Sequence, residues 1–186
     1  MLKTITKFAS SCLILGFVIT FGISNTAANE LELVVGTGGT SSAAFSAGNG
    51  MSIASVMHGK GIKIYSYGTK GDKDNIKRLT KKKRAINLAI VSAKGLAKAN
   101  DKQKKGMSGL IALGKAKGDT LLLVARNKAP KGVSKDKYSF AITEVVRVLK
   151  DTKAGKIIKN EWRNWSVSSG VSAFKAAGVK IHKAGM

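Results

Sequence analysis

The sequence predicts a single α/β domain in which helices cover both faces of a mostly parallel sheet of about five strands. Three observations support this fold class. Apolar, strand-like segments alternate with helical segments from residue 31 to about residue 99, which is the order of βαβ units joined by right-handed crossovers. Small or polar residues follow each of the first three strand-like segments. The length that remains after the N-terminal segment suits one domain and is short for two.

Residues 1–28 have the features of a cleavable secretory signal peptide. Two lysines precede an apolar run over about residues 9–23, and small residues follow it up to Ala28. We expect cleavage after Ala28, a periplasmic location and one mature domain over 29–186. The alternative, an uncleaved membrane anchor, is disfavoured because the run is short and contains glycine. The mature chain is therefore expected to have no transmembrane segment.

The composition is strongly basic. The chain has 33 Lys and Arg against 10 Asp and Glu, a net charge of +23, and without Lys3 and Lys7 of the signal peptide the charge is +21. Such a charge attracts anions of every kind. The one cysteine, Cys12, lies in the signal peptide, so the mature chain offers no disulfide and no thiolate. No cluster of acids and histidines has metal-ligand spacing, and we expect neither a metal nor a cofactor.

The loop after the first predicted strand is the first candidate ligand site. The apolar run over 31–36 passes into small residues, namely Gly36, Thr37, Gly38, Gly39, Thr40, Ser41 and Ser42. The glycines allow a tight turn close to a ligand, and the hydroxyl residues can cap a helix over 43–57 whose free N–H groups attract anions. The spacing is neither that of a dinucleotide fingerprint nor that of a P-loop. A βα turn without a ligand remains the alternative.

A second strand, loop and helix follow. Residues 62–67 alternate between apolar and polar side chains, as a half-buried strand does. The turn after them contains Thr69 and Gly71, and Asp72 or Asp74 is expected to cap a helix that continues over 75–84.

The third strand is predicted over 85–91 and is apolar enough to be buried on both faces. Ser92 opens a short helix to about Ala99, and residues 102–106 predict a basic loop. The remaining predicted elements are strands over 109–113 and 120–125, a helix over 138–150, a helical period through Ile157, Ile158, Trp162 and Trp165, and a last helix over 171–177.

The predicted topology brings three loops together. Open α/β sheets bind ligands at the carboxyl ends of their parallel strands. We therefore predict a site of backbone N–H and hydroxyl groups formed by Thr37, Gly38, Gly39, Thr40, Ser41, Thr69, Gly71, Asp72 and Ser92. Asp72 should act chiefly as a helix cap, because a carboxylate aimed at a bound anion would oppose binding.

Three segments within residues 31–99 occur in a characteristic order and spacing: Gly36–Thr40 with Phe45 and Gly48, Thr69–Leu79, and Leu88–Val91. In these segments the chain resembles the extracytoplasmic solute-binding proteins of TAXI-type TRAP transporters. The resemblance implies a type II periplasmic-binding-protein-like lobe that binds a small anionic or carboxylate solute. It also implies a TRAP membrane subunit as partner, and it adds Phe45 to the predicted site.

The chain departs from the family in one large respect. A full member has a second lobe inserted between the halves of the first, and the ligand lies between the two lobes. Here residues 106–125 pass directly from the first half to the closing helices. The sequence therefore predicts a single-lobe relative of the family.

A basic cell-envelope interaction protein without a small ligand is the alternative function. It would dock an acidic protein or another anionic surface through a dense basic run, Lys81, Lys82, Lys83 and Arg84. Few aromatic residues are interleaved with the basic ones, which argues against nucleic acid as the partner. We expect no catalytic residue and no enzyme activity, because neither His58 nor His182 lies in a motif with a carboxylate or a serine nucleophile.

Overall fold

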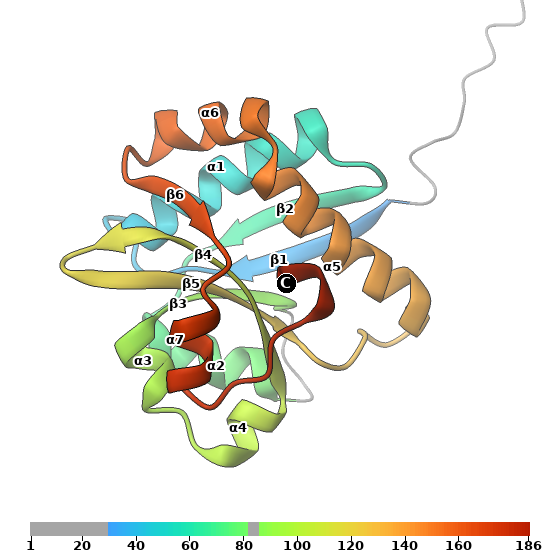
Figure 1. The fold of residues 1–186 in the computed structure, drawn as a ribbon. Helices are drawn as coiled ribbons and strands as arrows, with labels where there is room; N and C mark the ends of the chain where they lie inside the picture. Colours follow the sequence, from blue (N-terminus) through green and yellow to red (C-terminus); the bar gives the residue numbers. More distant parts are fainter. Residues whose placement is uncertain (1–29, 82–85) are drawn as a thin grey trace, which may run out of the picture.

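The computed structural model describes residues 30–81 and 86–186, and the predicted signal peptide and its cleavage site lie outside these ranges. The described chain is an α/β fold built around one curled sheet (Figure 1). Its strands are β1 (Leu31–Gly36), β2 (Ile62–Tyr67), β3 (Leu88–Ser92), β4 (Met107–Ala116), β5 (Asp119–Arg126) and β6 (Trp165–Ser168). Its helices are α1 (Ala43–His58), α2 (Asp72–Thr80), α3 (Ala93–Ala97), α4 (Asp101–Lys105), α5 (Lys135–Lys150), α6 (Thr152–Glu161) and α7 (Val171–Ala176), followed by the 3-10 turn η2 (Lys183–Gly185).

The sheet is mixed, so the prediction of a mostly parallel sheet is wrong. Its strand order is β2-β1-β3-β5-β4-β6. The strands β2, β1 and β3 are parallel, as predicted, whereas the β3–β5, β5–β4 and β4–β6 pairs are antiparallel. The physical reason lies in the two residues that join β4 to β5, Lys117 and Gly118. A parallel pair needs a crossover of a dozen or more residues, so this connection allows only an antiparallel hairpin.

The β4–β5 turn has the backbone of a primed hairpin turn. Lys117 has φ 49° and Gly118 has φ 74°. Two successive positive φ angles match the right-handed twist of the flanking strands. Lys117 is the only non-glycine residue of the described ranges with a positive φ.

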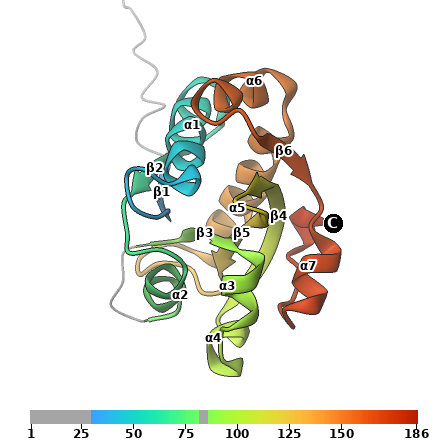
Figure 2. The same cartoon turned by 90° about the vertical axis from the view of Figure 1, so that its left-hand side faces the viewer.

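Helices cover both faces of the sheet, as predicted (Figure 2). One core lies between the sheet and α1, α5 and α6, and a second core lies between the sheet and α2, α3 and α7. The strand β3 serves both cores: Leu88 and Ile90 belong to the first, and Ala89 and Val91 belong to the second. This confirms the third strand as one buried on both faces.

The helix α1 packs closely because its inner positions are small. A Cβ added at Gly50 would come within 2.9 Å of the Ile158 backbone on α6. Two serines of the same helix reach the outer edge of β2. Ile64 N–H donates to Ser55 Oγ at 2.9 Å, and Ser66 N–H donates to Ser52 Oγ at 3.0 Å.

Other boundaries also differ from the prediction. The basic segment over 102–106 is mostly helix α4, because Asn100 and Gln103 form a capping box: each side chain accepts a hydrogen bond from the other's backbone N–H. Trp165 does not continue a helix but begins β6, where it pairs with Gly114 of β4. The helix α2 begins at Asp72, earlier than predicted, and ends at Thr80, before the predicted end at Arg84, because Lys81 has an extended backbone.

Candidate functional site

The loops after β1, β2 and β3 border one groove of about 560 Å³ at the carboxyl ends of these strands. Most of the predicted site residues line it, namely Thr37, Gly38, Gly39, Thr69, Gly71, Asp72 and Ser92. The start of α1, the loop after β2, helix α3 and the β4–β5 hairpin complete the lining with Ser42, Ala43, Ala44, Lys70, Lys94, Ala116, Lys117, Asp119 and Leu121. The structure therefore brings three separate sequence segments to one place.

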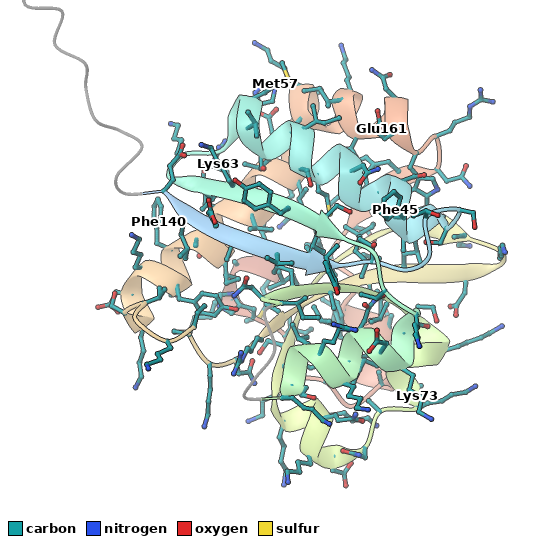
Figure 3. The ribbon with its side chains drawn as sticks, turned by 180° about the vertical axis from the view of Figure 1, so that it is seen from behind. Phe45, Met57, Lys63, Lys73, Phe140 and Glu161 are labelled. Atoms are coloured by element: carbon teal, nitrogen blue, oxygen red, sulfur yellow. The ribbon has the colours of Figure 1, made fainter. Side chains whose placement is uncertain are left out.

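Three predicted residues lie outside the lining of this groove. Thr40 and Ser41 are exposed in the turn before α1. Phe45 is half-buried on the first turn of α1, with its ring close to Gly68 (Figure 3). Ser42 lines the groove instead, and its hydroxyl caps α1 by accepting a hydrogen bond from Phe45 N–H at 3.2 Å.

Asn75 ties the loops after β1 and β2 to strand β3, and it was not among the predicted site residues. Its side chain is fully buried. The amide group donates to Thr37 O and, at 2.9 Å, to Ile90 O, while Oδ1 accepts from Thr69 Oγ1 at 2.6 Å. One side chain thus bonds to the loop after β1, to β3 and to the loop after β2. The sequence contained one signal for this role: Asn75 is next to Ile76, which was predicted to lie on the inner face of the helix.

The threonine hydroxyls hold the loops in place. Thr37 donates to Tyr67 O from both its N–H and its Oγ1, each at 3.0 Å. Thr69 N–H donates to Gly38 O at 3.1 Å. Because these donors are already used inside the protein, a ligand would meet backbone N–H groups rather than the predicted threonine hydroxyls.

Asp72 does not cap its own helix, so that prediction is wrong. The N-cap of α2 is Gly71, and no side chain caps it. The Asp72 carboxylate instead accepts hydrogen bonds from Ser92 N–H at 3.1 Å and Ser92 Oγ at 2.6 Å. Ser92 Oγ in turn accepts from Gly95 N–H at 2.9 Å and caps α3. A Cβ at position 95 would overlap the Asp72 carboxylate, so glycine is needed there.

The groove offers several groups that suit an anion. The backbone N–H groups of Gly39, Ala43 and Ala44 have no hydrogen-bond acceptor among the described residues. Those of Ala43 and Ala44 lie at the N-terminus of the 16-residue helix α1, where aligned peptide dipoles attract negative charge. Two of the three residues, Ala43 and Ala44, carry side chains too short to cover the N–H groups.

Charged side chains line the groove as well. Three of them are lysines, Lys70, Lys94 and Lys117. The two carboxylates, those of Asp72 and Asp119, are engaged within the protein: Asp119 accepts from Lys94 N–H at 3.1 Å and from Thr120 N–H at 2.8 Å. Three lysines against two carboxylates leave the groove with an excess of one positive charge.

Neither Lys81 nor His182 lines this groove. Lys81 is exposed just after α2, whereas Lys82, Lys83 and Arg84 lie outside the described residues. His182 caps the turn η2 through Nδ1, and burial lowers its pKa below the usual value. The described ranges contain no group of three side chains able to hold a metal ion. None of their helices is long and apolar enough to cross a membrane.

Comparisons with known proteins add no family to this picture. The sequence matches no protein-family model, and no curated protein is significantly similar to it.

Proposed function

We propose that this chain is a periplasmic solute-binding-like protein that binds a small carboxylate anion in the groove. One observation carries the proposal: loops from three sequence segments, which the sequence predicts to form a site, line the same groove. The free N–H groups of α1 and the three lysines support an anionic ligand.

The hairpin supports a single-lobe form of the TAXI-type receptors. Its turn, Lys117 and Gly118, lies where the resemblance places the inserted second lobe, and Lys117 lines the groove. A groove bounded by one lobe leaves part of a small ligand in water, and so we expect weak binding by the isolated chain. A second protein surface, such as that of a TRAP membrane subunit, would raise the affinity by covering the ligand.

A pair of matched variants tests the site. Ala44→Asp introduces a carboxylate into the groove, whereas Ser41→Asp introduces one outside it in the same turn region. Both place an acid near the N-terminus of α1, which favours the helix, so both should fold. Calorimetry and amide chemical shifts would follow titration with dicarboxylates and amino acids.

We expect Ala44→Asp to weaken binding at least about tenfold, the effect of roughly 1.4 kcal/mol, and Ser41→Asp to change it little. Chemical-shift changes should centre on residues 37–44 and 69–72. Equal binding by both variants, or shift changes elsewhere, would contradict the proposed site.

A second candidate function is docking of an acidic protein without a small ligand. The helices α2, α3 and α4 lie against one another and expose several cations, among them Lys77, Lys81, Lys98, Lys102 and Lys105. Long-range attraction to an acidic partner would speed association and weaken steeply with salt.

Pull-down at low and high salt tests this docking. Reversing two charges with Lys81→Glu and Lys102→Glu should release an acidic partner, whereas the exposed pair Lys156→Glu and Lys159→Glu on α6 is the control. Retention of the partner by the first variant would exclude this surface.

A further inference from the structure

Large apolar side chains are exposed near the amino ends of β1 and β2, on the opposite side of the molecule from the groove. Val56 is 65%, Met57 is 64% and Phe140 is 57% exposed. Figure 3 shows Phe140 beside the start of β1, Met57 at the top of the view, and Phe45, near the groove, at the other end of α1 from Met57. The two helices α1 and α5 contribute these side chains, and neither core includes them.

A shallow hollow of about 390 Å³ lies at the same end. Its lining consists of Leu31, Lys60, Gly61, Lys137 and Phe140. Apolar side chains are thus combined with two exposed lysines, and the lining contains no carboxylate. The nearby Glu30 carboxylate is paired with Lys63 at 2.6 Å. We call Val56, Met57, Phe140, Lys60 and Lys137 together the amino-end patch.

The combination of residues in the amino-end patch fits the surface of a lipid bilayer. Large apolar side chains enter the boundary between headgroups and acyl chains, while lysines remain at the level of anionic headgroups. An apolar cluster alone would suit many partners. The two lysines and the net charge, +21 without the predicted signal peptide, favour an anionic surface over a neutral one.

The position of the patch along the chain also points to a membrane. The apolar run over residues 9–23 precedes Glu30, the first described residue, by only a few residues. A chain of that length spans at most about 25 Å. While the N-terminal segment is attached and held in a bilayer, the amino-end patch is therefore within reach of the same bilayer.

We propose that the amino-end patch docks the domain on an anionic phospholipid bilayer, with the groove facing away from the lipid. The apolar side chains and the lysines act together. The groove and its loops take no part in this contact, so it is independent of the proposed solute binding.

Vesicle co-sedimentation of the exported protein, purified as the cell releases it, tests the proposal. Vesicles of phosphatidylglycerol and phosphatidylcholine would be compared with vesicles of phosphatidylcholine alone. Met57→Ser and Phe140→Ser remove apolar contacts, and Met186→Ser is the matched control, because Met186 is 73% exposed at the C-terminus. Lys60→Gln with Lys137→Gln removes two charges of the patch, and Lys70→Gln with Lys117→Gln removes two at the groove. All variants share the same N-terminus.

We expect the wild-type protein to bind the anionic vesicles. The double variant Met57→Ser with Phe140→Ser should bind them about tenfold more weakly. Replacing the two patch lysines should weaken binding to the anionic vesicles about fivefold for each charge removed. Replacing the two groove lysines should weaken it clearly less. Circular dichroism and thermal unfolding of each variant would establish that it folds. Absence of vesicle binding overturns the proposal, as does an equal loss in the patch and groove lysine pairs. A dimer in free solution that disappears in the apolar double variant also overturns it, since the patch would then be a self-association surface.

Discussion

The Glu144 carboxylate on α5 accepts a hydrogen bond from the Lys60 backbone N–H at 2.7 Å. This contact joins the long helix to the turn between α1 and β2. Arg147 completes it by donating to the same carboxylate from Nε at 2.7 Å and from Nη2 at 2.6 Å, while Nη2 also donates to His58 O at 2.6 Å. Glu144 is buried, so its charge depends on these donors.

Glu144→Ala should lower the free energy of unfolding by about 2–3 kcal/mol, because it leaves the Lys60 N–H and the Arg147 guanidinium without their acceptor. Urea unfolding followed by circular dichroism would measure this. Glu161→Ala, at the exposed end of α6 (Figure 3), is the control and should change stability by less than about 0.5 kcal/mol. Similar effects of the two substitutions would show that the Glu144 contacts contribute little.

Stability should also fall in acid through the same carboxylate. The hydrogen bonds from Arg147, and then the one from Lys60, hold the pKa of Glu144 below its ordinary value of 4.5. A carboxyl group with a lowered folded-state pKa stabilises the fold at higher pH, and this contribution is lost as pH falls below 4.5 toward the folded-state pKa. Urea unfolding between pH 6 and pH 3 should therefore show a shallower decline for Glu144→Gln than for the wild type. Parallel curves would assign the acid sensitivity to other groups.

Asn75→Ala should loosen the loops after β1 and β2. The substitution leaves the buried Thr37 O and Ile90 O without the amide donor, at a cost of about 2–3 kcal/mol. Asn160→Ala, at an exposed position of α6, provides the control. Hydrogen exchange should accelerate in residues 37–39 and 69–71 of the Asn75 variant. Unchanged exchange in those segments would mean that the Asn75 bonds do not hold the loops.

Lys117→Gly should stabilise the protein by about 1 kcal/mol, since glycine adopts φ 49° without the steric cost that lysine bears. Lys117→Gln keeps the side chain bulk, removes the charge and should leave stability nearly unchanged. Both variants should bind a carboxylate more weakly if Lys117 attracts it. Thermal unfolding and calorimetry on the same samples separate the two effects. A loss of stability in the glycine variant would show that Lys117 makes contacts that compensate for its backbone.

Local patterns were sufficient to predict the first half of the fold. Each pattern reflects a local requirement. The alternation over residues 62–67 indicates a strand with one buried face, and the apolar run before Ser92 indicates a strand with two. The small residues around Gly38 indicate a tight turn. These requirements placed β1, β2 and β3 and brought most of the site residues to one groove.

The remaining features depend on partners distant in sequence. The orientation of β5 follows from a two-residue turn whose lysine, Lys117, is not a usual residue for a positive φ. Asp72 had the sequence context of a helix cap, but its partner is Ser92, which lies 20 residues away. The role of Asn75 rests on Thr37, 38 residues away. Such pairings leave no periodic signal in the sequence.

The serines of α1 that reach β2 have a consequence for self-assembly. A strand at the end of a sheet invites another chain to extend the ladder, which is a common route to aggregates. Here Ser52 and Ser55 occupy the outward N–H groups of Ser66 and Ile64, so an incoming strand finds two donors already engaged. The packing of α1 on β2 thus protects this side of the sheet against fibril-like growth.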